Sequence, residues 1–286
     1  MDRFSSLDRD HRKSAPIAVL PSPQDAYPPA QVARLVEQVG VKKATLPVVQ
    51  TLVLGVLAGA FIAFGAMSFT LVMTGSELGL GPSRLLGGLA FSLGLILVVV
   101  GGAELFTGNN LIVMAWAERK VTSLQLGRNW SLVYLANLVG SLGSALMMSW
   151  SGALALGDGA VAETAVRIGE AKVALGFGQA FFSGILCNVL VCLAVWLCFA
   201  AHDVAGKILA IIFPISAFVA LGFEHSIANM YLIPIAWLAG AEAVTIESFL
   251  ANLVPVTLGN IVGGGLFVAL VYWLVYLHST AHRAAN

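Results

Sequence analysis

The chain has 286 residues, of which 58% are hydrophobic and 10% are charged, and this composition excludes an ordinary water-soluble globular domain. Its 15 Lys plus Arg residues equal its 15 Asp plus Glu residues, so the net charge of zero gives no indication of a nucleic-acid partner. The three cysteines all lie in one apolar stretch, which is not typical of a disulfide framework. We also expect no cleavable signal peptide, because the polar N-terminus lacks an apolar core.

The N-terminal part of the chain divides into two segments. Residues 1–29 are polar and rich in proline, which predicts a mobile tail. Within residues 30–43, Val32, Val36 and Val39 recur at helical spacing while charged residues occupy other faces. This pattern predicts an amphipathic helix at the membrane interface, and a solvated linker is the alternative.

Long stretches without Asp, Glu, Lys or Arg indicate membrane spans. A spanning helix needs about 20 mostly apolar residues. Four uncharged stretches are long enough for one helix each: 44–76, 129–157, 173–202 and 248–282. Two further apolar segments, 85–117 and 208–240, each have an acidic residue near the middle, Glu104 and Glu224 respectively. We therefore predict an all-α membrane domain over residues 44–278, with six transmembrane helices of which the second and the fifth are broken.

The Lys and Arg residues are distributed unevenly between the two sides of this membrane domain. Twelve of them lie on the side of the N-terminus, whereas only Arg84, Arg167 and Lys172 lie on the other side. Cytoplasmic loops carry an excess of Lys and Arg. The sequence therefore predicts that both termini are cytoplasmic, including a short C-terminal tail over residues 279–286.

The two halves of the membrane domain share a sequence pattern. Residues 102–109 line up with residues 222–229, with Gly, Glu and Asn at the same spacing. Further matches occur in the same order: Lys43, Gln50 and Gly55 with Lys172, Gln179 and Gly184, and Asn137 and Gly140 with Asn260 and Gly263. A three-helix unit used twice must be inverted in its second copy, and inverted repeats with broken helices are typical of channels and transporters. Chance similarity between helices rich in small residues is the alternative.

Three segments of the chain resemble the formate/nitrite transporter family. Residues 99–108 (VVGGAELFTG) resemble its first signature, residues 184–194 its second, and residues 222–230 its third conserved stretch. The resemblance implies an aquaporin-like protomer with its own pore, assembled as a homopentamer among the lipids of a prokaryotic inner membrane. It also implies passage of small monovalent anions such as formate, nitrite or hydrosulfide, with no catalysis, no cofactor and no metal.

The same resemblance implies roles for single residues. His225 would be the central histidine with Asn188 beside it, Thr107 would belong to the gating loop of the first break, and Lys172 would lie at the periplasmic vestibule. The constrictions implied by the family are Leu95, Phe91 and Leu105 toward one side and Phe218 on the other. We hypothesise that Lys172 attracts the anion and that hydrogen bonds from His225, Asn188 and Thr107 then hold it. Protonation by or through His225 would let it cross the apolar constrictions as a neutral acid.

The residues themselves leave several roles open. His225 is the only histidine expected at membrane depth, so no second histidine is available for a haem or a metal cluster; a packing role is the alternative. We expect Glu104 and Glu224 to accept backbone N–H donors at the two breaks, and Asn109 and Asn229 to support the same loops, with proton relay as the alternative. Lys172 at a helix end is also typical of a side chain that only reaches to the interface.

The leading prediction is a channel or transporter for small monovalent anions, and formate is the favoured substrate. Residues 26–43 look more like the formate branch of the family than the nitrite branch, but nitrite and hydrosulfide remain alternatives for the same pore. A neutral-solute pore of the aquaporin type normally carries paired Asn-Pro-Ala motifs, and neither break contains one. A membrane anchor or enzyme subunit would need paired His or clustered Cys ligands, which the sequence does not provide.

Overall fold

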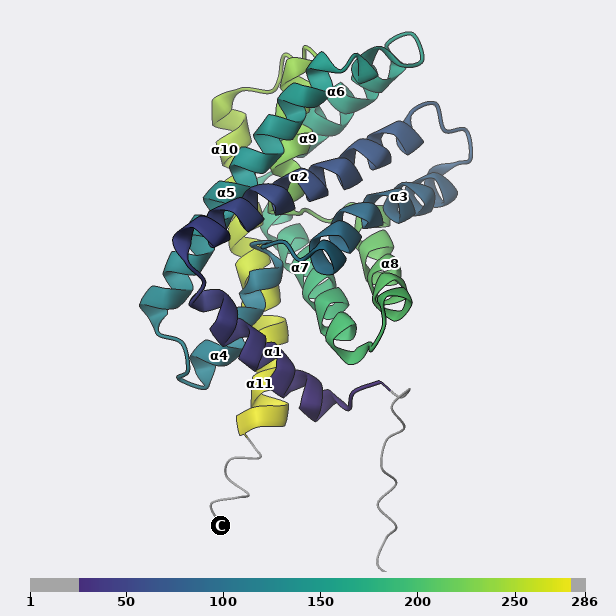
Figure 1. Cartoon of the computed structure of the whole chain (residues 1–286). Coiled ribbons are helices and arrows are strands. Elements are labelled where there is room, and N and C mark those ends of the chain that lie inside the picture. The colour runs from purple at the N-terminus through teal and green to yellow at the C-terminus, as the bar shows by residue number, and fades with distance from the viewer. Residues whose placement is uncertain (1–25, 279–286) are drawn as a thin grey trace, which may run out of the picture.

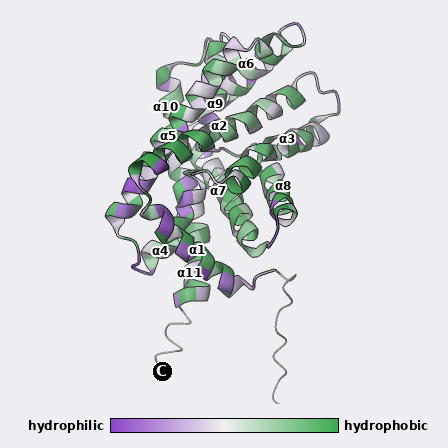
Figure 2. Ribbon diagram, in the orientation of Figure 1, coloured by the Kyte–Doolittle hydropathy of each residue, from purple (hydrophilic) through white to green (hydrophobic). Residues whose placement is uncertain are grey.

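The computed structural model describes residues 26–278, and within this range the chain is helical and contains no strand (Figure 1). The expected C-terminal tail and most of the expected N-terminal tail lie outside the described residues. Five helical segments are long and apolar enough to cross a membrane: α2 (Val48–Met73), α3 (Leu80–Gly101), α5 (Ser123–Trp150), α7 (Phe177–Ala200) and the run Ile246–His278. Hydrophobic residues predominate along these helices in Figure 2. The all-helical expectation is therefore confirmed.

Two further apolar elements contain the expected breaks. The helix α3 ends at Gly101, and the chain continues without regular structure to the 3-10 turn η1 (Gly108–Ile112) and the short helix α4 (Val113–Ala117). The helix α8 (Val204–Ala220) stops in the same way, and α9 (Ser226–Leu238) begins after a short extended stretch.

A glycine lies close to the helix end at each break: Gly102 directly follows α3, and Gly222 follows α8 after Leu221. Gly102 has φ +81° and Gly222 has φ +72°, a left-handed conformation that glycine adopts without steric cost. The two breaks therefore begin with the same backbone device, at positions that match in the sequences of the two halves.

Each half of the chain begins with a shorter helix that packs on the segment after its break. The first, α1 (Pro29–Ala44), has Pro at its start and Lys42 and Lys43 in its last turn, where the helix dipole stabilises positive charge. It packs on η1 and α4, at the lower end of the view in Figure 1. The second, α6 (Ala160–Val173), packs on α9 at the opposite end of the molecule.

The helix α6 was not expected from the sequence, although a signal for it exists. The alignment that matches Lys43 with Lys172 also matches Gly40 of α1 with Gly169 of α6, and both glycines are buried. A Cβ atom at Gly40 would lie 3.3 Å from the Ala115 side chain, so α1 approaches α4 closely at this point.

The remaining elements complete the bundle. The helix α2 packs along α5 and α3, and α7 packs along α8 and α10 (Ile246–Ile261). The last helix continues after α10 as the π-helix η3 (Val262–Leu270), the single turn α11 (Val271–Trp273) and the π-helical turn η4 (Leu274–His278). A short 3-10 turn, η2 (Ala153–Ala155), lies in the loop between the halves. This packing brings the two breaks together near the middle of the bundle.

Candidate functional site

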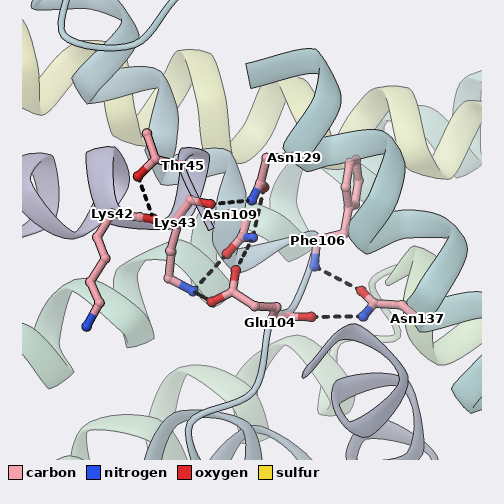
Figure 3. Close-up of polar contacts among 8 residues, drawn as sticks. All are labelled: Lys42, Lys43, Thr45, Glu104, Phe106, Asn109, Asn129 and Asn137. Carbon is pink, nitrogen blue, oxygen red and sulfur yellow. Dashed lines mark hydrogen bonds and ion pairs between the residues drawn. The ribbon is translucent and has the colours of Figure 1, made fainter. Parts of the chain in front are cut away.

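A cluster of four polar side chains holds the first break (Figure 3). Lys43 Nζ donates to Glu104 Oε1 at 2.6 Å and to Asn109 Oδ1 at 3.0 Å. Asn109 Nδ2 donates to Glu104 Oε2 at 2.7 Å and to Asn129 Oδ1 at 3.0 Å. The ring of contacts closes where Asn129 Nδ2 donates to the Lys43 carbonyl at 3.0 Å. The carboxylate is buried, and an ammonium group and an amide satisfy its oxygens.

A second cluster of the same composition holds the second break. Lys172 Nζ donates to Glu224 Oε1 at 2.8 Å, and Asn229 Nδ2 donates to Glu224 Oε2 at 2.6 Å. Asn229 Nδ2 also donates to Asn252 Oδ1 at 2.8 Å, and Asn252 Nδ2 donates to the Lys172 carbonyl at 2.8 Å. The contact from Lys43 to Asn109 Oδ1 has no counterpart in this cluster, where Asn229 Oδ1 has no hydrogen-bond partner within the described residues.

A buried asparagine on α5 joins the backbone of the first break to α2. The Phe106 N–H donates to Asn137 Oδ1 at 2.9 Å (Figure 3). Asn137 Nδ2 donates to the Glu104 carbonyl at 2.9 Å and to the Gly55 carbonyl at 2.7 Å. One side chain therefore satisfies both a donor and an acceptor that the interrupted helix leaves free.

Asn260 makes the same contacts at the second break. The Ser226 N–H donates to Asn260 Oδ1 at 2.9 Å. Asn260 Nδ2 donates to the Glu224 carbonyl at 3.0 Å and to the Gly184 carbonyl at 2.8 Å. The two asparagines match in sequence, so a side chain of the same kind supports both loops.

The contacts differ from the expectation for the two glutamates. Glu104 and Glu224 lie at the breaks, but their carboxylates accept from lysine and asparagine side chains and not from backbone N–H groups. The backbone donors go to Asn137 and Asn260, to which sequence reasoning gave no role. The amide group of Asn109 also contacts side chains and not the backbone of the loop. The physical reason is that a buried carboxylate needs a cation, whereas a neutral amide can satisfy backbone donors and acceptors together.

The structure places His225 and Thr107 in contact between the two breaks. His225 is the N-cap of α9, and its Nδ1 accepts from the Ala228 N–H at 3.0 Å. Its Nε2 lies 2.9 Å from Thr107 Oγ1. Because Nδ1 is an acceptor, the neutral ring carries its proton on Nε2 and donates it to the Thr107 hydroxyl. Both residues are buried, so a hydroxyl group and an imidazole ring lie in contact where the two halves of the chain meet.

Asn188 lies on α7 beside this pair. Its Nδ2 donates to the Asn260 carbonyl at 2.7 Å and to the Thr107 carbonyl at 3.2 Å, and it lies 3.4 Å from Asn110 Oδ1. Its Oδ1 is buried and has no hydrogen-bond donor within the described part of the chain. The expected neighbours Thr107, Asn188 and His225 are therefore brought together.

Aromatic rings cover one side of the central group formed by Thr107, Asn188 and His225. The rings of Phe218 and His225 stack with centroids 6.0 Å apart, and Phe218 meets Phe91 edge to face at 5.6 Å. The expectation grouped Phe91 with Leu95 and Leu105, and separated it from Phe218. The contact shows the opposite grouping, because Phe91 lies one helical turn before Leu95 on α3 and packs on α8.

Leu95 and Leu105 lie apart from the aromatic rings and line a cavity of about 920 Å³. Lys42, Lys43 and Lys207 also line this cavity, so it combines an apolar surface with cationic side chains. Glu104, the ion-pair partner of Lys43, lines the cavity as well, so Lys42 and Lys207 are the cations there beyond that pair, and they would favour an anion.

Lys172, expected to attract anions at the opposite vestibule, is largely buried in the second cluster. Its side chain is 14% exposed, against 27% for Lys43 in the first cluster. Each ammonium group already has a carboxylate partner. The positions and pairing are thus the same in the two halves, in agreement with the sequence match between the two lysines.

The chain is similar to known proteins over most of its length. The model of the formate/nitrite transporter family matches residues 30–274. The formate channel FocA of Escherichia coli strain K12 is 40% identical over 281 residues, which cover 92% of this chain and 99% of that protein.

Two solved structures are similar over most of the chain. One, described as a pentameric formate channel with formate bound, has a TM-score of 0.75 and 41% identity, and the match covers 80% of this chain and 98% of the other. The second, described as an FNT family ion channel, has a TM-score of 0.79 and 31% identity, and the match covers 86% of this chain and 98% of the other. The fold and the sequence therefore point to the same group of multi-pass membrane proteins.

Proposed function

This chain belongs to the formate/nitrite transporter family, and on that premise we propose that it carries formate and related small monovalent anions across the membrane. The observation that carries this proposal is the buried contact of 2.9 Å between Thr107 Oγ1 and His225 Nε2, enclosed by the two broken helices. A hydroxyl group and an imidazole N–H are donors that a carboxylate can accept from. Leucines on one side and phenylalanines on the other would exclude larger solutes.

The electrostatics of the site favour passage of the anion in a neutral form. A carboxylate in a low-dielectric constriction loses its hydration, which costs several kcal/mol unless the charge is compensated. The central group offers hydrogen bonds from Nε2–H of His225 and from the Thr107 hydroxyl to the acid. We propose that formate receives a proton that enters from water and passes through His225, which is neutral again after the transfer. The neutral acid then crosses the apolar rings and returns the proton to water on the far side.

The test of this function is anion flux in proteoliposomes. Formate, nitrite, hydrosulfide, acetate and chloride should be compared at two pH values, with an empty-liposome control. Formate should pass fastest, and its flux should depend on pH. Comparable uptake of glycerol without selectivity among the anions would contradict the proposal, and faster passage of nitrite or hydrosulfide would assign the pore to that anion.

We propose six membrane spans in two inverted copies of a three-helix unit. In this arrangement α3 with η1 and α4 forms the second span, and α8 with α9 forms the fifth. The paired contacts of the clusters at Glu104 and Glu224 support it, as do the matched roles of Asn137 and Asn260. An aquaporin-like plan of this kind places unwound backbone only where protein covers it.

We also propose an orientation, an assembly and a division of the chain. The excess of Lys and Arg on one side supports cytoplasmic termini in a prokaryotic plasma membrane, so that the cavity lined by Lys42 and Lys207 faces the cytoplasm. The tails 1–29 and 279–286 would then flank an interfacial helix, 30–43, and the channel domain, 44–278. Similarity to a pentameric formate channel supports a homopentamer, and light scattering of the protein in detergent tests it.

A further inference from the structure

Three consecutive glycines in the π-helix η3 face three different neighbours. A Cβ atom at Gly265 would meet only the Val113 side chain, at an ordinary 3.5 Å. A Cβ atom at Gly263 would collide with the backbone of Ile185, so this glycine permits close packing of η3 on α7. The glycine between them, Gly264, faces neither open space nor backbone.

Gly264 faces polar side chains of the central site. A Cβ atom there would lie 2.5 Å from Asn188 Nδ2, 2.7 Å from Cys192 Sγ and 2.8 Å from Asn110 Cβ. All three side chains are fully buried, so none can move into solvent to make room. The space occupied by the Asn188 amide therefore exists because residue 264 has no side chain.

The side chains beside Gly264 hold the loop of the first break. Asn188 Nδ2 donates to the Thr107 carbonyl at 3.2 Å, and Cys192 Sγ donates to the same carbonyl at 3.4 Å. The hydroxyl group of Thr107 contacts His225. Since Asn188 Oδ1 has no donor in the described range, only its Nδ2 contacts and the packing at Gly264 fix the amide. A continuous set of contacts thus leads from Gly264 to the His225 ring.

The first half of the chain has the same kind of packing, but the polar residue and the glycine are on the opposite helices. The alignment of the halves matches Asn188 with Gly59 and Gly264 with Ser141. Ser141 Oγ, facing Gly59, donates to the Gly59 carbonyl at 3.4 Å and lies 3.5 Å from the Ile227 carbonyl. Ile227 is the position that matches Thr107. In each half, one helix supplies a polar side chain toward a backbone carbonyl just after the break of the opposite half, and the neighbouring helix supplies a glycine.

We propose that Gly264 is a positioning residue for transport: it sets the place of the Asn188 amide and, through the Thr107 carbonyl, the contact between Thr107 and His225. This inference rests on the proposed function, because it assigns Gly264 to the site that passes the anion. A methyl group at this position shifts the Thr107 loop without touching His225 directly. Displacements of about 1 Å at such a site reduce rates by up to about a hundredfold.

The experiment compares Gly264→Ala with Gly265→Ala in the full-length protein. Both substitutions add one methyl group to the same π-helix, so they have the same effect on intrinsic helix formation. Each variant is purified, its assembly is measured by size-exclusion chromatography, and formate flux in proteoliposomes is recorded across a range of pH. We expect Gly265→Ala to match the wild type, and Gly264→Ala to assemble normally with formate flux reduced about tenfold and an altered pH dependence.

A second variant keeps the proposal testable if Gly264→Ala does not assemble. In Cys192→Ala/Gly264→Ala the smaller side chain at 192 gives the new methyl group room, so assembly should return while the altered pH dependence persists. An assembled Gly264→Ala protein with wild-type flux and pH dependence would overturn the inference. So would failure of both variants to assemble, which would assign Gly264 to packing alone. Absence of formate flux in the wild type would instead contradict the proposed function.

Discussion

The ammonium group of Lys172 lies 2.8 Å from the carboxylate of Glu224, and this ion pair has fewer hydrogen bonds around it than the pair of Lys43 and Glu104 in the first half. Lys43 contacts both Glu104 and Asn109, whereas Asn229 Oδ1 has no donor within the described residues. The second cluster therefore depends more strongly on one charge pair. The first prediction follows from this difference.

Glu224→Gln should impair assembly more than selectivity. The substitution leaves the Lys172 ammonium largely buried without a counter-charge, and breaking a buried pair costs about 3–5 kcal/mol. Size-exclusion chromatography should show a several-fold smaller fraction of assembled protein, whereas Glu242→Gln, at an exposed glutamate, should have no effect. Lys172→Met/Glu224→Gln removes the unpaired charge and should restore much of the assembly. A well-assembled Glu224→Gln protein with an altered pH response would instead support proton relay.

Asn260→Ala should lower the thermal stability of the protein in detergent. The Ser226 N–H and the carbonyls of Glu224 and Gly184 would lose their partner, and each unsatisfied buried group costs about 1–3 kcal/mol. Asn137→Ala should have an effect of similar size at the first break. Ser151→Ala, at an exposed hydroxyl, is the control. Unchanged unfolding temperatures for both asparagine variants would show that the breaks do not need these side chains.

Substitution of His225 should change how formate flux depends on pH. Asn at this position retains an acceptor for the Ala228 N–H at the start of α9 but has no titratable proton, whereas Phe removes both functions. We expect both variants to lose about tenfold or more in flux and to lose the pH dependence of the wild type. Flux measurements in proteoliposomes at several pH values decide this. An unchanged pH dependence in His225→Asn would exclude protonation by the histidine.

Phe91→Ala should widen the pore and relax its selectivity for size. Phe91 and Phe218 meet edge to face beside His225, and truncation of one ring opens space next to the central site. The ratio of acetate flux to formate flux should rise several-fold. The control is Phe213→Ala, which truncates an exposed ring on α8. If the ratio stays at the wild-type value in an assembled protein, the two phenylalanines do not form the constriction.

Much of the architecture could be predicted because it depends on the positions of a few charges. Uncharged stretches of sufficient length indicated the long helices, and Glu104 and Glu224 marked the segments in which the structure has breaks. Family membership was also predicted from the strings around these residues, and the match of the family model to residues 30–274 confirms it. These features are visible in sequence because membrane insertion tolerates so few ionisable groups.

The partners of the polar residues could not be predicted in the same way. The sequence aligned Asn137 with Asn260, but only the three-dimensional packing shows that each amide reaches both a break and a neighbouring helix. The expected separation of Phe91 from Phe218 was wrong, because ring contacts depend on how α3 and α8 are rotated. The helix α6 was missed because it is short and because most of its hydrophobic residues are the small side chains Ala and Val. It became recognisable only through its match to α1.

The polar cluster at each break lies within one half of the chain, whereas the contacts at the centre cross between the halves. The cluster around Glu104 uses only residues before the loop at Ser151, and the cluster around Glu224 uses only residues after it. By contrast, the contact between Thr107 and His225 joins the two halves. A half-chain could therefore keep its own Lys–Glu–Asn cluster, but it would lack the contact between Thr107 and His225 and the contacts across the halves that hold the Thr107 loop. A substitution in one cluster therefore acts first on its own half, whereas a substitution at Thr107 or His225 removes a contact that both halves share.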